Sequence, residues 1–508
     1  MDWLATFTIN SLNILAVLFV CAVGLFLAAV IVMFVVDRTQ RADAIRHNYP
    51  VIGRFRGLFT YLGEFFRQYF FAMDREEMPF NRAERDWVYK SSAGEDNTVA
   101  FGSTRRLDPV GTPIFVNAPF PPLEEETTEP PSKVIGPYAK RPYEASSIIN
   151  ISGMSFGAIS RPAVTALSKG AKMAGCWLNT GEGGLSPYHL EGGCDIVFQI
   201  GTAKYGVRTA DGALSDEKLR EVVVHDKVRM IEVKLSQGAK PGKGGILPGA
   251  KVTKEIAEIR GIPPHEASIS PNRHREVDTL EDLLEFIAHV RDVSGLPTGF
   301  KSVIGSYQWL EYMCALIKKR GMKSAPDFIT VDSGDGGTGA APMPLMDNCG
   351  LPVREALPAV IDILSRYGLR DRIKVICSGK LITPASVSWA YCAGADFVVS
   401  ARGFMFALGC IQAMKCNKNT CPTGITTHDE DLQGGLDPED KAVRVMNFVK
   451  KIRYGVGIIS HSCGVAHPRA LQRQHVRIVQ ADGKSVPLNE LYPPVKPPAK
   501  PKQKRAVR

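Results

Sequence analysis

The chain has 508 residues, of which 44% are hydrophobic and 22% are charged, a globular composition that excludes a mostly disordered protein. The formal net charge is +10, but residues 496–508 hold six lysines and arginines and no acid, so about +4 remains for the rest. This excess is too small to predict a nucleic-acid-binding face, and nucleic acid is not expected as a partner. Eleven cysteines are too few for a disulfide framework in a chain of this length, which favours a reducing compartment.

The N-terminal region contains an apolar run. Residues 14–36 form 23 consecutive positions without a charge. As a helix rising about 1.5 Å per residue, the run reaches about 34 Å, enough to cross a hydrocarbon core of about 30 Å. A cleaved signal peptide would have a positively charged segment before the apolar run, but no Lys or Arg precedes it here. Residues 1–37 are therefore predicted to be an uncleaved transmembrane anchor. Arg38, Arg41 and Arg46 follow it, and the positive-inside rule then predicts a single-pass membrane protein with its catalytic domain in the cytoplasm.

Residues 38–133 are predicted to be a juxtamembrane and linker region. Within it, residues 54–72 mix aromatic and basic side chains, which favours a helix that either lies in the interface and contacts membrane lipid or covers the catalytic domain. Residues 119–133 are rich in proline and glutamate without apolar periodicity, and we expect an exposed loop. At the other end of the chain, residues 476–508 are predicted to be a basic tail rich in proline and lysine.

Residues 134–475 alternate short β-branched runs with amphipathic stretches, a pattern typical of βα units. Eight such units over about 260 residues predict an α/β fold, a TIM (β/α)8 barrel preceded by the transmembrane helix. A doubly wound open sheet is the alternative. The candidate strands are residues 148–152, 177–179, 196–200, 230–234, 299–304, 328–332, 374–377 and 397–400.

Six of these strands are followed by loops with more glycine and polar residues than tight turns need. Glycine lets backbone N–H groups approach an anion closely, and TIM barrels bind their ligands at this end of the strands. Six such loops on one face of the barrel indicate a large phosphorylated ligand such as a flavin nucleotide. The loops are residues 153–157, 179–184, 234–245, 333–340, 378–380 and 401–403.

Three cysteines stand close together after the last strand. Cys410, Cys416 and Cys421 lie within twelve residues, and Pro422 follows the third. This spacing suits an iron–sulfur cluster with three cysteine ligands better than zinc, whose sites usually contain C-x2-C pairs. Spacing alone leaves open that the three are buried structural cysteines, because free cysteine is among the most buried residue types.

A resemblance to a known family rests on six stretches: GMSFGAIS, LNTGEGGLSPYH, KLSQGAKPGKGGILPGAKV, SISPNRH, DSGDGGTGAAP and GCIQAMKCNKNTCPTGI. In this order they resemble the FMN-binding synthase domain of the glutamate synthase family, over about residues 148–470. The chain looks like a stand-alone, membrane-anchored member. The resemblance implies FMN in a TIM-type barrel and a [3Fe–4S] cluster on the three cysteines. It also implies an oxidoreductase acting on the CH–NH2 group of donors, which makes L-glutamate by reductive amination of 2-oxoglutarate with ammonia.

Strand-end position and this resemblance together suggest the residues that contact the flavin. Lys301 on the fifth strand is expected to face FMN N1/O2, where a cation stabilises the reduced flavin; a structural salt bridge is its alternative. Gln199 is expected to donate a hydrogen bond to the isoalloxazine edge. The other cofactor-binding candidates are Ser155, Gly336 and Gly337, with Gly379, Ala401 and Arg402 around the phosphate.

The substrate candidates lie in the second and fourth loops and beyond. Lys240 is expected to bind the substrate carboxylate or carbonyl. Glu182 is expected to carry a proton or bind ammonium, with a loop ion pair as the alternative. Arg273 and His274 are candidates for the distal carboxylate, although a lone histidine is more often structural.

Two departures from the family pattern affect the prediction. The chain starts with an apolar run where full glutamate synthases have a glutaminase domain, so ammonia is expected from solution or from a separate glutaminase. Lys243 replaces the usual glutamate of GAKPGEGG, which leaves an FMN oxidoreductase for another 2-oxo or amino acid open. A membrane-tethered FMN and iron–sulfur electron-transfer subunit is the other alternative. No G-x-G-x-x-G follows a strand, so the electron donor is expected to be a separate protein, a ferredoxin or an NAD(P)H-oxidising flavoprotein.

Overall fold

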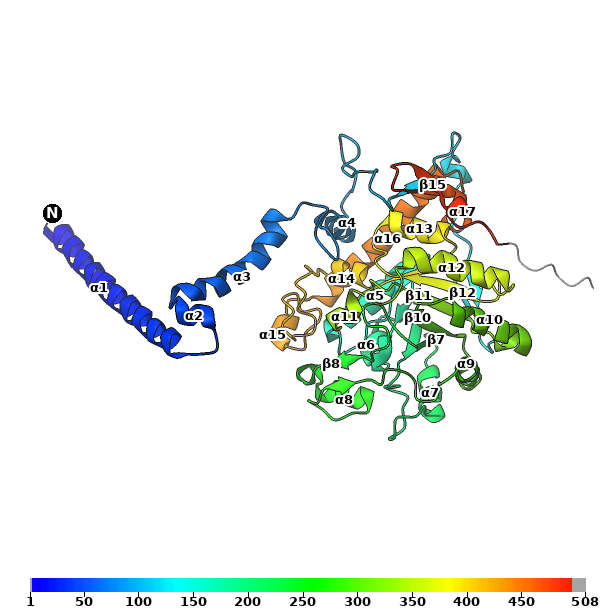
Figure 1. The fold of residues 1–508 in the computed structure, drawn as a ribbon, viewed down its shortest axis with the longest axis horizontal. Helices are drawn as coiled ribbons and strands as arrows, with labels where there is room; N and C mark the ends of the chain where they lie inside the picture. The colour runs from blue at the N-terminus through cyan, green and yellow to red at the C-terminus, as the bar shows by residue number, and fades with distance from the viewer. Residues whose placement is uncertain (1, 496–508) are drawn as a thin grey trace, which may run out of the picture. The chain divides into compact units, whose positions relative to one another are not determined.

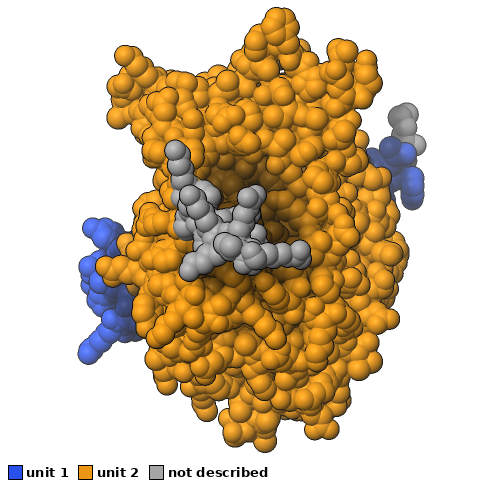
Figure 2. All heavy atoms as spheres, turned by 90° about the vertical axis from the view of Figure 1, so that its right-hand side faces the viewer, with its two compact units in different colours: residues 1–83 blue, residues 84–508 orange. Residues whose placement is uncertain are grey.

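The computed structural model describes residues 2–495, so the basic residues of 496–508 lie outside the described residues. The chain divides after Ala83 into two compact units. Figure 2 colours the two units and shows residues 84–495 as one continuous body.

The first unit is dominated by α1 (Asp2–Thr39), a helix with few polar side chains. Its most apolar stretch has a mean hydropathy of 3.1, and by length and composition the helix can cross a membrane. The prediction of a long apolar helix at this end of the chain is confirmed (Figure 1).

A buried carboxylate marks the end of α1. Asp37 accepts hydrogen bonds from Arg46 Nη2 at 2.6 Å, from Arg54 Nε at 2.7 Å and from the backbone N–H of Val51 at 3.0 Å. These contacts hold α2 (Ala44–Asn48) and the 3-10 turn η1 (Ile52–Arg54) close to the end of α1. The chain therefore turns back directly after the apolar run.

The segment that mixes aromatic and basic residues is helical, as predicted. It forms α3 (Phe55–Phe66), which continues into the π-helical turn η2 (Arg67–Phe71). Phe59, Phe65 and Phe70 are exposed side chains of this segment.

The second unit is built on a closed barrel of eight parallel strands, which confirms the predicted TIM-type architecture and excludes the open sheet. The strands are rich in valine and isoleucine. Most of their residues are buried on both faces of the sheet, as expected for parallel strands covered by helices. Going around the barrel they are β10 (Thr298–Val303), β11 (Phe328–Asp332), β12 (Lys374–Ser378), β13 (Phe397–Ser400), β4 (Ile149–Ile151), β5 (Leu178–Asn179), β6 (Ile196–Ile200) and β7 (Val228–Lys234).

One end of the barrel is filled by apolar side chains. The hairpin of β2 (Lys133–Ile135) and β3 (Tyr143–Ala145) contributes Tyr143, whose ring meets the edge of Trp177 at 6.3 Å. Trp177 in turn packs against Phe397, the first residue of β13, at 5.1 Å. Because this cluster occupies the start of the strands, the polar residues at their carboxyl ends remain available for a site.

Helices surround the strands (Figure 1). The longest helix of the second unit, α16, packs on α5. A Cβ added at Gly170 of α5 would lie 2.5 Å from Val445 Cβ, so glycine is needed for this close approach. The helices beyond unit 1 are α4 (Arg82–Ala93), α5 (Arg161–Ala174), α6 (Pro187–Glu191), α7 (Asp216–Val223), α8 (Lys254–Arg260), α9 (Leu280–Ser294), α10 (Gln308–Arg320), α11 (Met343–Met346), α12 (Val353–Arg366), α13 (Pro384–Cys392), α14 (Arg402–Ala407), α15 (Glu430–Gln433), α16 (Pro438–Ser462) and α17 (Leu488–Leu491).

Two small sheets complete the unit. β8 (Ile246–Leu247) and β9 (Ser268–Ile269) pair within the long segment that follows β7. β14 (Val476–Val479) pairs with β1 (Pro113–Phe115) and with β15 (Ser485–Pro487). The folded unit therefore extends beyond residues 134–475 on both sides.

Candidate functional site

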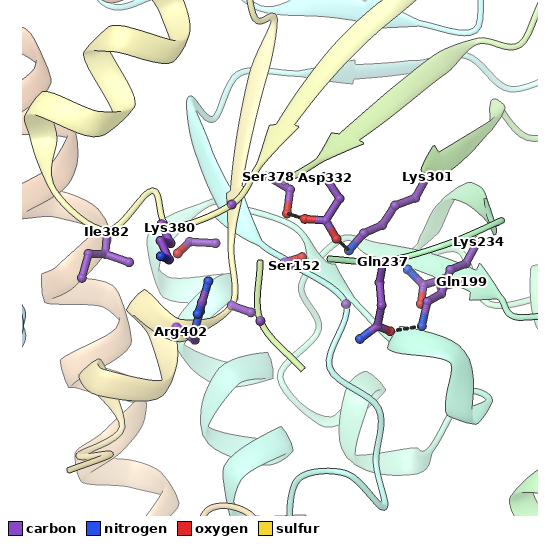
Figure 3. A pocket seen from close by; sticks show the side chains of 15 residues that line it. Ser152, Gln199, Lys234, Gln237, Lys301, Asp332, Ser378, Lys380, Ile382 and Arg402 are labelled. Carbon is purple, nitrogen blue, oxygen red and sulfur yellow. Dashed lines mark hydrogen bonds and ion pairs between the residues drawn. The ribbon is translucent and has the colours of Figure 1, made fainter. Parts of the chain in front are cut away.

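A polar cavity lies at the carboxyl ends of the barrel strands, where a TIM barrel places its chemistry (Figure 3). Six of the predicted residues line it: Gln199, Lys301, Gly337, Gly379, Ala401 and Arg402. Sequence reasoning did not assign the other lining residues, which are Ser152, Gly153, Lys234, Gln237, Asp332, Ser378, Lys380, Ile382 and Ser400.

Lys301 of β10 and Asp332 of β11 form a buried ion pair in this cavity. Lys301 Nζ lies 3.1 Å from Asp332 Oδ2, and Asp332 also accepts hydrogen bonds from Ser378 Oγ at 2.8 Å and the Gly238 N–H at 3.0 Å (Figure 3). Burial alone would lower the pKa of Lys301, but the carboxylates of Asp332 and Glu232 outweigh it and raise that pKa. Lys301 is therefore a charged residue that both lines the cavity and makes a structural salt bridge.

Glu232, inside β7, fixes the position of Gln199. Glu232 Oε1 accepts hydrogen bonds from Gln199 Nε2 at 2.7 Å and from Asn179 Nδ2 at 2.8 Å. Thr330 Oγ1 donates to the other carboxylate oxygen at 2.5 Å. The carboxylate thus links β7 to three other strands, β5, β6 and β11, and it holds the Gln199 amide at the cavity wall.

A second cluster of charged side chains is centred on Glu182, which lies in the loop after β5. Lys234 Nζ donates to Glu182 Oε1 at 2.7 Å. It also donates to Gln237 Oε1, a contact that Figure 3 shows. Burial alone would raise the pKa of Glu182, but the charges of Lys234, Lys240 and Arg260 outweigh it and lower that pKa. Glu182 is therefore an ionised, partly buried carboxylate surrounded by three cations.

Lys240 is buried beside the same carboxylate. Only 4% of the residue is exposed, and burial, together with the charge of Lys234, lowers its pKa to about 8. Within residues 2–495, no hydrogen bond or ion pair to Lys240 Nζ is formed. The structure thus brings the predicted Glu182 and Lys240 together around Lys234, a cavity residue that sequence reasoning did not assign.

Two substrate candidates lie elsewhere. Arg273 is an exposed side chain that pairs with Asp278 Oδ1 at 2.5 Å and donates to the Val277 carbonyl. His274 is buried, and its Nε2 lies 3.0 Å from the Lys234 carbonyl oxygen; since a carbonyl only accepts, Nε2 carries the proton. Burial lowers the pKa of His274 to about 4, so the ring is neutral. The structure brings neither side chain into the cavity, and His274 supports the backbone of Lys234 instead.

Two cofactor candidates contribute backbone and packing. At Gly336 an added Cβ would come within 2.8 Å of the Ser333 carbonyl oxygen and 3.2 Å of Gly238 Cα. The Ser155 hydroxyl lies 3.5 Å from Arg260 Nη2. Neither residue lines the cavity.

The other side of the cavity combines glycine backbone with two cations. Gly379 has a φ of +128°, and a Cβ there would lie 2.2 Å from Ser333 Cβ, so only glycine fits. Lys380 Nζ lies 2.9 Å from Asp335 Oδ2, and Arg402 Nη2 donates to the Asp335 carbonyl oxygen at 3.4 Å. A glycine cradle flanked by Lys380 and Arg402 fits the phosphate of a flavin nucleotide.

The three predicted cluster ligands lie in the loop between α14 and α15, and all three are free thiols. The Gln412 N–H donates to Cys410 Sγ at 3.4 Å, and Cys421 Sγ lies 3.4 Å from Thr423 Oγ1. Among the described residues, no group of three His, Cys, Asp or Glu side chains is arranged to hold one metal ion. The ligands of an iron–sulfur cluster bind different iron atoms, so they stand further apart than the ligands of a single ion.

A buried lysine accompanies the cysteine loop. Lys251 is 2% exposed, and its Nζ donates to the carbonyl oxygens of Ala158 at 2.7 Å and Cys416 at 3.3 Å. Burial raises the pKa of the Cys416 thiol, and the positive charge of Lys251 opposes that rise. The chemistry of the donor set, three thiols beside a buried cation, fits an anionic iron–sulfur cluster.

Comparison with known proteins assigns the chain to a family. The model for the conserved region in glutamate synthase matches residues 114–466. The chain belongs to the glutamate synthase family. The prediction of an oxidoreductase of the glutamate synthase type is therefore confirmed at the level of the family.

Relatives cover most of the chain. The glutamate synthase large subunit-like protein YerD of Bacillus subtilis is 39% identical over 498 residues, which are 90% of this chain and 94% of the relative. The archaeal glutamate synthase (NADPH) of Methanocaldococcus jannaschii is 33% identical over 342 residues, 67% of this chain and 63% of that protein. Among solved structures, the flavin-binding domain of baker's yeast flavocytochrome b2 is 12% identical and has a TM-score of 0.44, over 84% of this chain and 86% of that one.

Proposed function

We propose that the chain makes L-glutamate from 2-oxoglutarate and ammonia, with FMN in the cavity and a [3Fe–4S] cluster on Cys410, Cys416 and Cys421. The single observation that supports this best is the composition of the cavity region. In a member of the glutamate synthase family, a glycine and cation cradle on one side of the cavity stands opposite the partly buried Glu182–Lys234 pair on the other. A phosphate-bearing cofactor and an acidic substrate would use the two sides separately.

The residues of the cradle would hold the cofactor. Gly337, Gly379, Lys380, Ala401 and Arg402 would bind the phosphate, with Gln199 and Lys301 at the isoalloxazine edge. When bound, FMN supplies the two electrons that reduce the imine of the substrate. The Lys301 charge, maintained by Asp332, would stabilise negative charge at the ring edge.

The residues around Glu182 would bind the substrate. Lys240 would pair with a carboxylate of 2-oxoglutarate, because its Nζ makes no hydrogen bond or ion pair within the described part of the chain. Glu182 Oε1 is already bound to Lys234 Nζ, so Oε2 would hold ammonium or carry the proton. Lys234 would keep Glu182 ionised and in place.

The direct test of this function is the reoxidation of the flavin. The full-length protein, solubilised and reduced under anaerobic conditions, should have its flavin absorbance restored by 2-oxoglutarate with ammonium and not by either alone. Reoxidation by a redox protein but by no 2-oxo acid with ammonium would favour an electron-transfer subunit. Reoxidation by a different 2-oxo acid would support the substrate change suggested by Lys243.

The cluster would relay electrons to the cavity from a separate donor protein, a ferredoxin or an NAD(P)H-oxidising flavoprotein. Cys416→Ser should abolish the EPR signal of the oxidised cluster while FMN stays bound, because a serine hydroxyl is a poor ligand for iron in such a cluster. Cys349→Ser, a change at a free cysteine outside the loop, is the matched control and should leave the signal unchanged. Stoichiometric zinc without iron in fresh anaerobic protein would contradict the proposal.

We also propose that α1 anchors the chain in a membrane, with the barrel in the cytoplasm. The arginines after the apolar run and the exposed aromatic side chains of α3 support this orientation, with α3 in the membrane interface.

In intact cells, a cysteine introduced by Thr98→Cys should react with a membrane-impermeant maleimide only after permeabilisation. Ala5→Cys, at the other end of α1, is the matched control and should react from outside. Labelling of Thr98→Cys in intact cells would show the opposite orientation.

A further inference from the structure

Helix α4 (Arg82–Ala93) precedes the region that the family shares, which begins at residue 114, and from Glu84 on it belongs to the second unit and packs on α16. The rings of Trp87 and Phe448, the latter on α16, pack edge to face with their centroids 6.3 Å apart. Asn447 of α16 donates a hydrogen bond to the Ser92 carbonyl at 3.1 Å. The position of α4 on the barrel unit is therefore set by side chains that do not belong to the cysteine loop.

From this position α4 contacts the cysteine loop through two side chains. Tyr89 Oη donates to the Cys410 carbonyl oxygen at 2.6 Å. Arg85 Nη1 donates to the Ile411 carbonyl oxygen at 3.3 Å. Both contacts are to the backbone, one at the first of the three cysteines and the other at the residue that follows it.

The Arg85 contact reaches the sulfur atom through one peptide group. The Ile411 carbonyl and the Gln412 N–H belong to the same peptide, and this N–H donates to Cys410 Sγ at 3.4 Å. A cation on the carbonyl oxygen polarises the peptide and strengthens the hydrogen bond that its N–H donates. Arg85 is only 6% exposed, so solvent screens its charge little.

Hydrogen bonds to ligand sulfur atoms and nearby charge are among the factors that set the reduction potential of iron–sulfur clusters. Both effects of Arg85 stabilise the reduced cluster, which carries one more negative charge than the oxidised one. We propose that Arg85 is a positioning residue that raises the reduction potential of the cluster, by orienting and polarising the peptide that is hydrogen-bonded to Cys410. This inference rests on the proposed cluster.

An EPR-monitored redox titration of the full-length, anaerobically purified protein tests it. In Arg85→Gln the midpoint potential should fall. At the wild-type midpoint the reduced fraction should drop from one half to about one tenth, because a hydrogen bond to a charged group is worth roughly a factor of ten or more. Such a tenfold change corresponds to about 59 mV for a one-electron couple.

Two variants separate this effect from damage to the helix. Arg85→Lys keeps the charge without the planar guanidinium and should give a midpoint between those of wild type and Arg85→Gln. Lys90→Gln changes an exposed residue of the same helix, which pairs with Asp86 at 2.9 Å, and should titrate like wild type. If Arg85→Gln does not retain iron, Arg85→Lys is compared with wild type, and only a lower midpoint supports the proposal.

The outcomes distinguish this inference from the proposed function. An unchanged midpoint in Arg85→Gln, or an equal shift in Lys90→Gln, would overturn the role of Arg85 and leave the cluster in place. Wild-type protein without iron would remove the proposed cluster and this inference together.

Discussion

Lys240→Met is expected to lower turnover about a hundredfold. In a water-poor site, a charged hydrogen bond to the substrate contributes about 2–4 kcal/mol to transition-state binding, and methionine keeps the volume of the side chain while removing the charge. Steady-state turnover of 2-oxoglutarate with ammonium and an artificial reductant measures the loss. The matched control is Lys254→Met, at an exposed lysine of α8, and it should change turnover little.

The pH dependence gives Lys240 a second readout. Because its pKa is about 8, the charged form disappears as the pH rises through that value, and kcat/KM of the wild type should fall there. A wild-type profile that stays flat through pH 8, or a fall of the same size in Lys240→Met, would contradict a charged role.

The buried charge of Lys240 should lower the free energy of unfolding of the protein. Its folded-state pKa lies below the value of 10.5 in the unfolded chain, so keeping it charged in the folded protein costs free energy below pH 8. This cost disappears as the pH rises from about 8 to 10.5. Without bound ligands, Lys240→Met should therefore raise the free energy of unfolding near pH 7, by up to about 3 kcal/mol. A variant that is both less active and more stable is the expected combination.

Lys301→Met is expected to destabilise the barrel by about 3–5 kcal/mol and to abolish FMN binding, because Asp332 is left as a buried carboxylate without its cation. Chemical denaturation and the flavin content of the purified protein measure the two effects. Lys301→Met combined with Asp332→Asn should recover part of the stability, since the uncompensated charge is removed. A double variant no more stable than Lys301→Met would show that the ion pair is not the cause.

An exposed ion pair provides the control for this experiment. Arg366 Nη1 lies 2.6 Å from Glu311 Oε1, and both side chains are more than one-third exposed. Arg366→Met should therefore cost at most about 1 kcal/mol.

The barrel could be predicted because each of its strands and helices is marked by a pattern in its own short stretch of sequence. Each strand is a short β-branched run, and each is separated from the next by a helix with its own apolar face, so all eight strands appear within one or two residues of the predicted ranges. Glycine-rich loops likewise pointed to the strand ends that line the cavity.

The charged residues of the site needed information that the local pattern does not contain. Glu232 lies within the buried strand β7 and Asp332 ends the buried strand β11, and their partners Gln199 and Lys301 come from neighbouring strands. An acid inside a buried strand was the available signal, because such a charge requires a partner. Lys234 could have been found from the barrel register, which places it directly beside Lys301.

Local competition explains the candidates that lie outside the cavity. Arg273 pairs with Asp278, five residues further along, so its charge is satisfied within its own loop. The contacts of Arg85 and Tyr89 with the cysteine loop join positions more than 300 residues apart, and no sequence pattern indicates them.

The most direct test of the central claim is a single-turnover experiment with isotope-labelled ammonium. The full-length protein is reduced anaerobically, freed of excess reductant and mixed with 2-oxoglutarate and the labelled ammonium, and the products are separated and weighed by mass spectrometry. Labelled L-glutamate is expected in an amount equal to the flavin reoxidised. Flavin that stays reduced, or that is reoxidised without labelled L-glutamate, would contradict it.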